Sequence, residues 1–184
     1  MKKEKKSNNV FVFDMDNTLV KTDKANNHAY SDAISSVLCE KCTIDPSKRF
    51  TRNELKKLLP NITQTQYNEI VARKEINFEL YLNETELNQN LISILRSLHQ
   101  EGNHTVLLTN CHSSRAISIC NFYNLTRYFS QRFFCEDCLD NKYSLLKSLG
   151  YDLQKVVLYE NEDTAYSEAV SNGINFENII KVEF

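Results

Sequence analysis

Short apolar runs that alternate with helical patterns are the feature that most restricts the fold of this chain. β-Branched and aromatic residues concentrate in five short runs, at Val10–Phe13, Thr105–Leu108, Arg132–Phe134, Val156–Tyr159 and Ile179–Val182. Between the later runs, apolar residues recur at helical spacing in Ser113–Tyr123, Lys142–Leu149 and Asp163–Ser171. Strands that alternate with helices form a parallel sheet covered on both faces. The sequence therefore predicts an α/β fold with a doubly wound parallel sheet.

The interval from residue 20 to residue 90 breaks this alternation. It contains no convincing strand, and its apolar residues repeat at helical spacing in three stretches, around Ala29–Leu38, Leu55–Leu59 and Tyr67–Tyr81. A chain of 184 residues is long enough for one domain with a sizeable insertion. We expect a core domain made of residues 9–19 and 91–184, interrupted by a helical domain of residues 20–90. The alternative is that these helices form one layer of a single core.

The first apolar run passes directly into a pair of aspartates, in the segment Asp14-Met15-Asp16-Asn17-Thr18. Residues i and i+2 of extended backbone project to the same side, so the two carboxylates converge. Such a pair repels unless a proton or cation joins it, and carboxylate oxygens suit Mg²⁺. The same residues also fit a turn with a helix N-cap. An EF-hand does not fit, because Leu19 and Ala25 occupy the required Gly and Glu positions. A glycosidase pair would hold its carboxylates about 5 Å or more apart.

The segment Phe13–Leu19 resembles motif I of the haloacid dehalogenase-like (HAD) superfamily, whose signature is hydrophobic-Asp-x-Asp-x-Thr/Val. The resemblance implies that Asp14 is a nucleophile that forms an aspartyl-phosphate. It implies that Asp16 is the general acid and base, and that its backbone carbonyl binds Mg²⁺. It also implies that residues 20–90 are the helical C1 cap of the family, inserted in a Rossmann-like core. Our expected substrate contacts in this cap are Asn26, Asn27, His28 and Tyr30.

Two further positions match motifs of the family. Thr109 follows the second apolar run, at the carboxyl edge where open α/β sheets place ligand groups, and it matches the Ser or Thr of motif II. Asn110 and the N–H groups of the helix beginning at Ser113 offer further donors there. Lys142 matches motif III, a Lys or Arg that offsets the charge of nucleophile and phosphate, with Lys147 as the weaker alternative.

The fourth motif is only partly matched. Counted back from Gly173, the segment after the fourth run resembles the variant Phe-Glu-Asp-Ser…Ala-Gly, with Glu160 and Asn161 at the two acidic positions. An amide oxygen remains a hard ligand but compensates less charge than a carboxylate. Glu162 or Asp163 supplies the acid instead if the loop is shifted. The Mg²⁺ ligands implied by the resemblance are Asp14, Asp16, Glu160 and Asn161.

Six cysteines include two Cys-x-x-Cys pairs, Cys39 with Cys42 and Cys135 with Cys138. We interpret them as reduced thiols that act as small hydrophobic residues. A shared zinc site is the alternative, although the long separation between the pairs disfavours it, and a thioredoxin-like redox pair is a third. The four histidines, among which His112 follows Thr109 closely, show neither metal spacing nor a triad pattern.

Charge and hydropathy exclude several partners. The net charge of −2 gives no electrostatic reason to expect nucleic acid or an acidic membrane as partner. Four lysines near the N-terminus suggest a disordered basic tail of residues 1–8. The sequence lacks both a membrane-spanning apolar stretch and a signal peptide, so we expect a cytoplasmic protein.

We therefore predict a Mg²⁺-dependent phosphatase, a hydrolase that cleaves a small phosphorylated metabolite through an aspartyl-phosphate. Asp14, Asp16, Thr109 and Lys142 are its expected catalytic residues. One alternative is a phosphomutase of the same superfamily. Another is a HAD-like binding or regulatory protein with weak or no catalysis, for which Asn161 is the sequence support. The sequence makes no prediction of the oligomeric state.

Overall fold

The computed structural model of the chain describes residues 9–45, 48–138 and 140–184. The predicted tail of residues 1–8 lies outside this part. The chain divides into two compact units. One, called the core unit, combines the segment up to Val20 with Leu87–Phe184; the other, called the helical insertion, is Lys21–Glu86.

The core unit is built on a five-stranded sheet with the order β5-β4-β1-β6-β7. Its strands are β1 (Val10–Phe13), β4 (His104–Leu108), β5 (Gln131–Phe133), β6 (Val156–Glu160) and β7 (Ile179–Lys181). All four pairings are parallel, and β1 lies in the middle with β4 and β6 as its neighbours. The predicted parallel sheet is thus confirmed, with each strand within one residue of its expected bounds.

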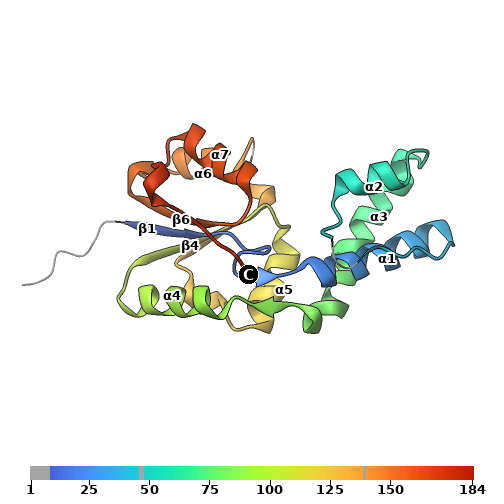
Figure 1. The fold of residues 1–184 in the computed structure, drawn as a ribbon, viewed down its shortest axis with the longest axis horizontal. Coiled ribbons are helices and arrows are strands. Elements are labelled where there is room, and N and C mark those ends of the chain that lie inside the picture. The colour runs from blue at the N-terminus through green and yellow to red at the C-terminus, as the bar shows by residue number, and fades with distance from the viewer. Residues whose placement is uncertain (1–8, 46–47, 139) are drawn as a thin grey trace, which may run out of the picture. The chain divides into compact units, whose positions relative to one another are not determined.

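Helices cover both faces of this sheet (Figure 1). On one face lie α4 (Gln89–Gln100) and α5 (Ser113–Phe122), and on the other α6 (Lys142–Ser148) and α7 (Asp163–Asn172). Short 3₁₀ turns complete the connections: η2 (Thr126–Tyr128), η3 (Cys135–Asp137), η4 (Leu153–Lys155) and η5 (Phe176–Asn178). Leu146 of α6 and Ala169 of α7 pack with Val106 and Leu158 of the sheet in one buried cluster. Burial of this apolar surface is the main term that holds the layers together.

A tight turn after β1 fixes the backbone that carries the aspartate pair. The Asp14 amide continues the ladder by donating to the Tyr159 carbonyl (3.1 Å). Asn17 adopts a left-handed conformation (φ 56°), which Asn tolerates better than most residues, and its amide donates to the Val20 carbonyl (2.7 Å). The Met15 and Leu19 side chains are fully buried and anchor the turn. The two aspartates therefore sit on a rigid segment of the sheet edge.

The helical insertion has an apolar core of its own. It contains α1 (Asp23–Leu38), α2 (Arg52–Leu58), α3 (Gln64–Asn77) and the 3₁₀ helix η1 (Phe78–Glu84). Its buried cluster is Tyr30, Ala33, Ile34, Leu55 and Ile70. Lys74 is the one polar interruption of the predicted apolar face, and it is buried with its Nζ 5.2 Å from the centre of the Tyr30 ring. The aromatic face and the Glu75 carboxylate (3.2 Å) stabilise this charge.

Two of the residues expected to contact substrate make hydrogen bonds within the insertion. The Asn26 amide donates to the Phe50 carbonyl (2.8 Å), and the Asn27 amide donates to the carbonyls of Lys48 (2.6 Å) and Asp45 (3.1 Å). Both side chains are buried. Their amide groups therefore satisfy backbone that has no regular partner, a structural use of asparagine.

The expectation that residues 20–90 contain no strand is wrong at both ends of that interval. Strands β2 (Val20–Lys21) and β3 (Glu86–Leu87) pair in a two-stranded sheet. Two residues are too few to produce a periodic pattern, so sequence analysis could not detect these strands. Among the described residues, no helix has both the length and the apolar composition that a membrane crossing requires.

Candidate active site

Buried polar side chains gather where β1, β4 and β6 end. Asp14 follows β1, Thr109 follows β4 and Glu160 ends β6, and all three are at most 6% exposed. These strands are neighbours in the sheet, so their carboxyl ends meet at one edge. The arrangement brings together residues that are 51 to 146 positions apart in sequence.

Lys142 is the centre of this cluster. Its Nζ donates to Asp14 Oδ1 (2.8 Å) and to Glu160 Oε2 (2.6 Å), and its side chain is 2% exposed. Asn141 places it, because the Asn141 side chain caps α6 by accepting from the Tyr143 and Ser144 amides. Lys147, the weaker sequence candidate, is exposed on the same helix. The structure thus joins Lys142, and not Lys147, to the predicted nucleophile.

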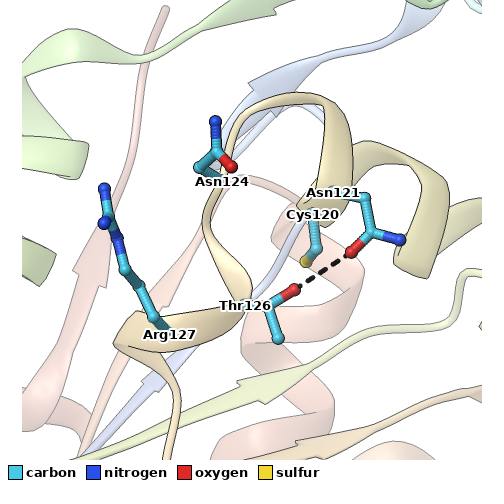
Figure 2. Close-up of a pocket in the computed structure, with 5 residues that line it drawn as sticks. All are labelled: Cys120, Asn121, Asn124, Thr126 and Arg127. Atoms are coloured by element: carbon cyan, nitrogen blue, oxygen red, sulfur yellow. Dashed lines mark hydrogen bonds between the residues drawn. The ribbon is translucent and has the colours of Figure 1, made fainter.

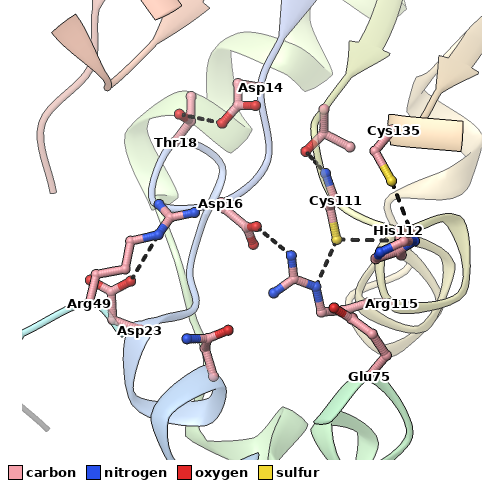
Figure 3. Close-up of polar contacts among 12 residues, drawn as sticks. Asp14, Asp16, Thr18, Asp23, Arg49, Glu75, Cys111, His112, Arg115 and Cys135 are labelled. Carbon is pink, nitrogen blue, oxygen red and sulfur yellow. Dashed lines mark hydrogen bonds and ion pairs between the residues drawn. The ribbon is translucent and has the colours of Figure 1, made fainter. Parts of the chain in front are cut away.

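Thr18 connects the nucleophile candidate to the fourth motif. Its Oγ1 lies 3.0 Å from both Asp14 Oδ2 and Asn161 Oδ1, and its single proton serves one of them at a time. The contact to Asp14 is visible in Figure 3. Asn161 therefore lies beside the aspartate pair. Glu162 and Asp163 are exposed, and Asp163 pairs with Lys181 instead, so neither joins the buried cluster.

Both carboxylate oxygens of Glu160 accept hydrogen bonds. Oε2 accepts from Lys142 and from the Tyr143 hydroxyl (2.8 Å), and Oε1 accepts from the amides of Asn161 (3.0 Å) and Glu162 (3.3 Å). Such contacts fix the carboxylate rigidly. Glu160 is thus held as the orienting partner of Lys142.

Arg115 is a site residue that sequence analysis missed. It lies on α5, is buried, and its Nη2 donates to Asp16 Oδ2 (2.8 Å) while its Nε donates to the Cys111 thiol (2.9 Å) (Figure 3). An Arg on a helical pattern gives no sign that it points inward. The one available signal is its place six residues after Thr109, on the helix that starts at the sheet edge.

Thr109, the candidate for motif II, follows β4 at the carboxyl edge of the sheet. It is fully buried, and its Oγ1 accepts from the Cys111 amide (3.1 Å), which shapes the loop between β4 and α5. That bond leaves the hydroxyl proton available for a further acceptor. Asn110, the second donor expected here, is exposed at the same loop.

Burial and charge repulsion act together on the Asp14 carboxyl. Burial raises its pKa, Lys142 opposes this, and the carboxylates of Glu160 and Asp16 add to the increase, so that the pKa reaches about 7. Burial also works against the charge of Lys142, but Asp14 and Glu160 outweigh it and raise the pKa of the ammonium. Lys142 is therefore cationic, whereas the buried Asp14 carboxyl ionises less readily than an exposed aspartate.

The donor set and the charge balance of this cluster fit a divalent cation. Three buried carboxylates, Asp14, Asp16 and Glu160, face two buried cations, Lys142 and Arg115. Within this set of five described residues the carboxylates outnumber the cations by one, and oxygen donors from Asp14, Asp16 and Asn161 are the hard ligands that Mg²⁺ uses. A bound cation would favour the ionised form of Asp14 and lower its pKa.

Two surface pockets of the core unit are lined by residues outside this cluster. One, of about 390 Å³, is lined by Cys120, Asn121, Asn124, Thr126 and Arg127 (Figure 2). It sits where α5 ends and η2 begins, and the Thr126 hydroxyl bonds Asn121 across it (3.4 Å). A second, of about 340 Å³, is lined by Gln131, Phe133, Leu149, Gly150 and Tyr151. Neither pocket contains a carboxylate, a metal-binding pair or a nucleophile–base pair.

The raised pKa of Asp14 predicts how stability depends on pH without metal. A carboxyl group whose pKa is higher in the folded state favours folding in its protonated form. Its contribution is therefore complete below the ordinary value of 3.8 and is lost as the pH rises through about 7. We expect the urea-unfolding free energy of wild type in a chelator to fall, relative to that of Asp14→Asn, across this window.

The exposed Asp152 serves as the control for this measurement, and Asp152→Asn should keep the wild-type decline. Parallel pH profiles for wild type and Asp14→Asn would show that burial does not perturb Asp14.

Solved structures share this fold over most of their length. CbbY from Rhodobacter sphaeroides, in complex with phosphate, is 14% identical with a TM-score of 0.78, covering 96% of this chain and 86% of that chain. A candidate β-phosphoglucomutase from Thermotoga maritima is 21% identical with a TM-score of 0.72 and the same coverage. A HAD-superfamily hydrolase of subfamily IA from Geobacter sulfurreducens is 13% identical with a TM-score of 0.68, covering 94% and 86%. No curated protein sequence matches the chain.

Sequence comparison with protein families gives a direct match. The family described as haloacid dehalogenase-like hydrolase matches residues 11–176, which span the region from β1 to the start of η5. This range includes the aspartate pair, Thr109, Lys142 and Glu160. The predicted hydrolase family is confirmed: the chain belongs to the haloacid dehalogenase-like hydrolases.

Proposed function

We propose that this hydrolase is a Mg²⁺-dependent phosphatase that cleaves a small phosphate monoester through an aspartyl-phosphate. The observation that carries the proposal is the buried Lys142 bridge between Asp14 and Glu160 at the carboxyl edge of the sheet. A lysine there neutralises an anionic nucleophile and an incoming anionic substrate at once. Few other reactions need a carboxylate, a fixed ammonium group and a cation site in one buried cluster.

Asp14 is the proposed nucleophile. Its Oδ1 is held by Lys142 and its Oδ2 by Thr18, so the carboxylate is oriented before substrate arrives. A carboxylate needs no separate base to become nucleophilic once it is ionised. Attack on phosphorus forms a bond from an Asp14 oxygen and releases the alcohol of the ester. Water then hydrolyses the aspartyl-phosphate and regenerates Asp14.

Asp16 is the proposed general acid and base. It protonates the leaving oxygen in the first step and removes a proton from the attacking water in the second. The Arg115 guanidinium donates to one Asp16 oxygen (2.8 Å) and so sets the orientation of this carboxyl group. We therefore propose Arg115 as a positioning residue that acts through Asp16.

Asp14, the Asp16 main-chain carbonyl and Asn161 are the residues that we propose as Mg²⁺ ligands. Two observations support this assignment: Thr18 contacts both Asp14 and Asn161, and the cluster carries excess negative charge. The bound metal would offset charge on the transferred phosphoryl group. The contacts already made by Glu160 favour an indirect part for it, in which it holds Lys142 in place. Thr109 and Lys142 would bind the phosphoryl oxygens.

The helical insertion is the proposed source of substrate selectivity. In the HAD family a helical cap performs this task, and Lys21–Glu86 has the composition and the independent core of such a domain. A sugar phosphate is a reasonable first substrate to test. The structure of a CbbY mutant from R. sphaeroides, which has a TM-score of 0.79 to this chain, was solved in complex with xylulose-(1,5)bisphosphate. We propose a small phosphorylated metabolite as the substrate class.

The first test is turnover of p-nitrophenyl phosphate with Mg²⁺. Wild type should release inorganic phosphate, and a chelator should stop the release. Asp14→Asn removes the nucleophile and should abolish turnover, while Asp16→Asn should lower kcat by about 10²- to 10⁴-fold, the usual contribution of a general acid. Asp152→Asn is the surface control. Absence of turnover across a broad panel of phosphate esters would reject the proposal.

The role of Arg115 has its own test. Arg115→Met should lower kcat for p-nitrophenyl phosphate by about 10- to 100-fold, because Asp16 loses its orientation, with a smaller change in KM. Arg115→Lys keeps the charge and should recover part of the loss. The exposed Arg127 provides the matched control, and Arg127→Met should behave as wild type. An unchanged kcat in folded Arg115→Met would exclude the positioning role.

A further inference from the structure

Three side chains with metal-binding atoms converge next to the loop that carries Thr109. They are His112, Cys135 and Glu136, and their ligand atoms all lie within 4.8 Å of one another. His112 immediately precedes α5, whereas Cys135 and Glu136 form the start of η3. The two segments follow β4 and β5, which are neighbours in the sheet. The cluster therefore lies at the same sheet edge as Asp14, but it shares no residue with the proposed Mg²⁺ ligands.

We propose that this cluster is a second metal site, which binds Zn²⁺ through His112 Nδ1, Cys135 Sγ and one Glu136 oxygen. Thiolate and imidazole are ligands that favour zinc over Mg²⁺. The proposal is independent of the phosphatase activity.

The spacing of the three donors suits tetrahedral zinc. His112 Nδ1 lies 3.0 Å from Glu136 Oε1 and 3.4 Å from Cys135 Sγ, and Cys135 Sγ lies 3.3 Å from Glu136 Oε2. Zinc bonds of about 2.0–2.3 Å at tetrahedral angles separate such donors by about 3.4–3.6 Å. The ligand atoms all lie within 4.8 Å of one another, so a small rotation of the Glu136 carboxylate brings one oxygen to this spacing from both other donors. Metal binding displaces the proton of the Cys135 thiol, which is released to solvent. His112 binds through the lone pair of Nδ1, with its proton on Nε2.

The backbone around the cluster is already fixed. The Cys135 amide donates to the Cys111 carbonyl (3.2 Å), which ties the two loops together. The Ser113 amide and hydroxyl hold the Glu136 carboxylate at the start of α5. This contact caps the helix and explains why the Glu136 carboxylate lies here. It does not explain why the His112 imidazole and the Cys135 thiol lie beside it. Figure 3 shows the Cys135 and His112 side chains turned toward one another.

The proposed zinc site is accessible to solvent, which can supply a fourth ligand. His112 and Glu136 are 31% and 45% exposed, so water can take the fourth position, as it does in open zinc sites. Cys138, the other half of the Cys-x-x-Cys pair, directs its thiol to the Phe134 carbonyl (3.4 Å) instead. The site is therefore distinct from a four-cysteine zinc site, which would use both thiols.

Titration of the reduced full-length protein with Zn²⁺, in competition with a chromophoric chelator and in excess Mg²⁺, tests the proposal. We expect one saturable Zn²⁺ per chain. Cys135→Ser should weaken Zn²⁺ binding by at least about tenfold. Loss of a residue that only hydrogen-bonds to a metal ligand already lowers metal affinity by about 10- to 100-fold. Co²⁺ substitution should give a thiolate charge-transfer band in wild type that Cys135→Ser lacks. Glu136→Gln tests the site without altering a cysteine and should also weaken binding.

Cys138→Ser is the matched control and should bind Zn²⁺ as wild type does. Asp14→Asn should also leave the affinity unchanged, which separates this site from the Mg²⁺ cluster. The proposal is overturned if wild type shows no saturable binding, if Cys135→Ser and Glu136→Gln both bind as wild type, or if Cys138→Ser loses the ion.

Discussion

The Lys142 bridge between Asp14 and Glu160 is the interaction on which the rest of the site depends. A buried carboxylate is costly unless it is paired, and here one ammonium group serves two carboxylates that end neighbouring strands. Removal of one partner of a buried pair typically costs about 3–5 kcal/mol. The parallel sheet is what makes the bridge possible, because the register of β1 against β6 brings both carboxylates to the same edge.

The charges and oxygen donors of the cluster fit an additional cation. Burial is the main cause of the raised pKa of Asp14, and the carboxylates of Glu160 and Asp16 add to it against the opposing charge of Lys142. A cation that binds beside Asp14 would remove this penalty and produce the ionised nucleophile in the same step. In the proposed phosphatase, negative charge that is unfavourable without a metal would therefore favour metal binding. Arg115 and Glu160 contribute by holding Asp16 and Lys142 at fixed positions.

The sequence predicted the sheet well because its signals are local. Apolar runs of four or five residues and helical spacing are sufficient to locate β1, β4, β6 and their helices, and the order of Asp14, Thr109, Lys142 and Glu160 along the chain led to the family. The two-residue strands β2 and β3 have no such signal. Arg115 and Tyr143 were missed because a polar residue within a helical pattern appears solvent-exposed until its partner, distant in sequence, is known. Sequence analysis considered Cys135 and His112 separately but did not join them with Glu136, because their spacing along the chain resembles no zinc motif.

A crystal structure with Mg²⁺ and beryllium trifluoride, which mimics a phosphoryl group on aspartate, tests the central claim most directly. The account predicts beryllium bonded to an Asp14 oxygen, fluorides in contact with Lys142 and Thr109, and Mg²⁺ held by Asp14, the Asp16 carbonyl and Asn161. Mg²⁺ bound away from Asp14, or beryllium trifluoride bound to any other carboxylate, would contradict it.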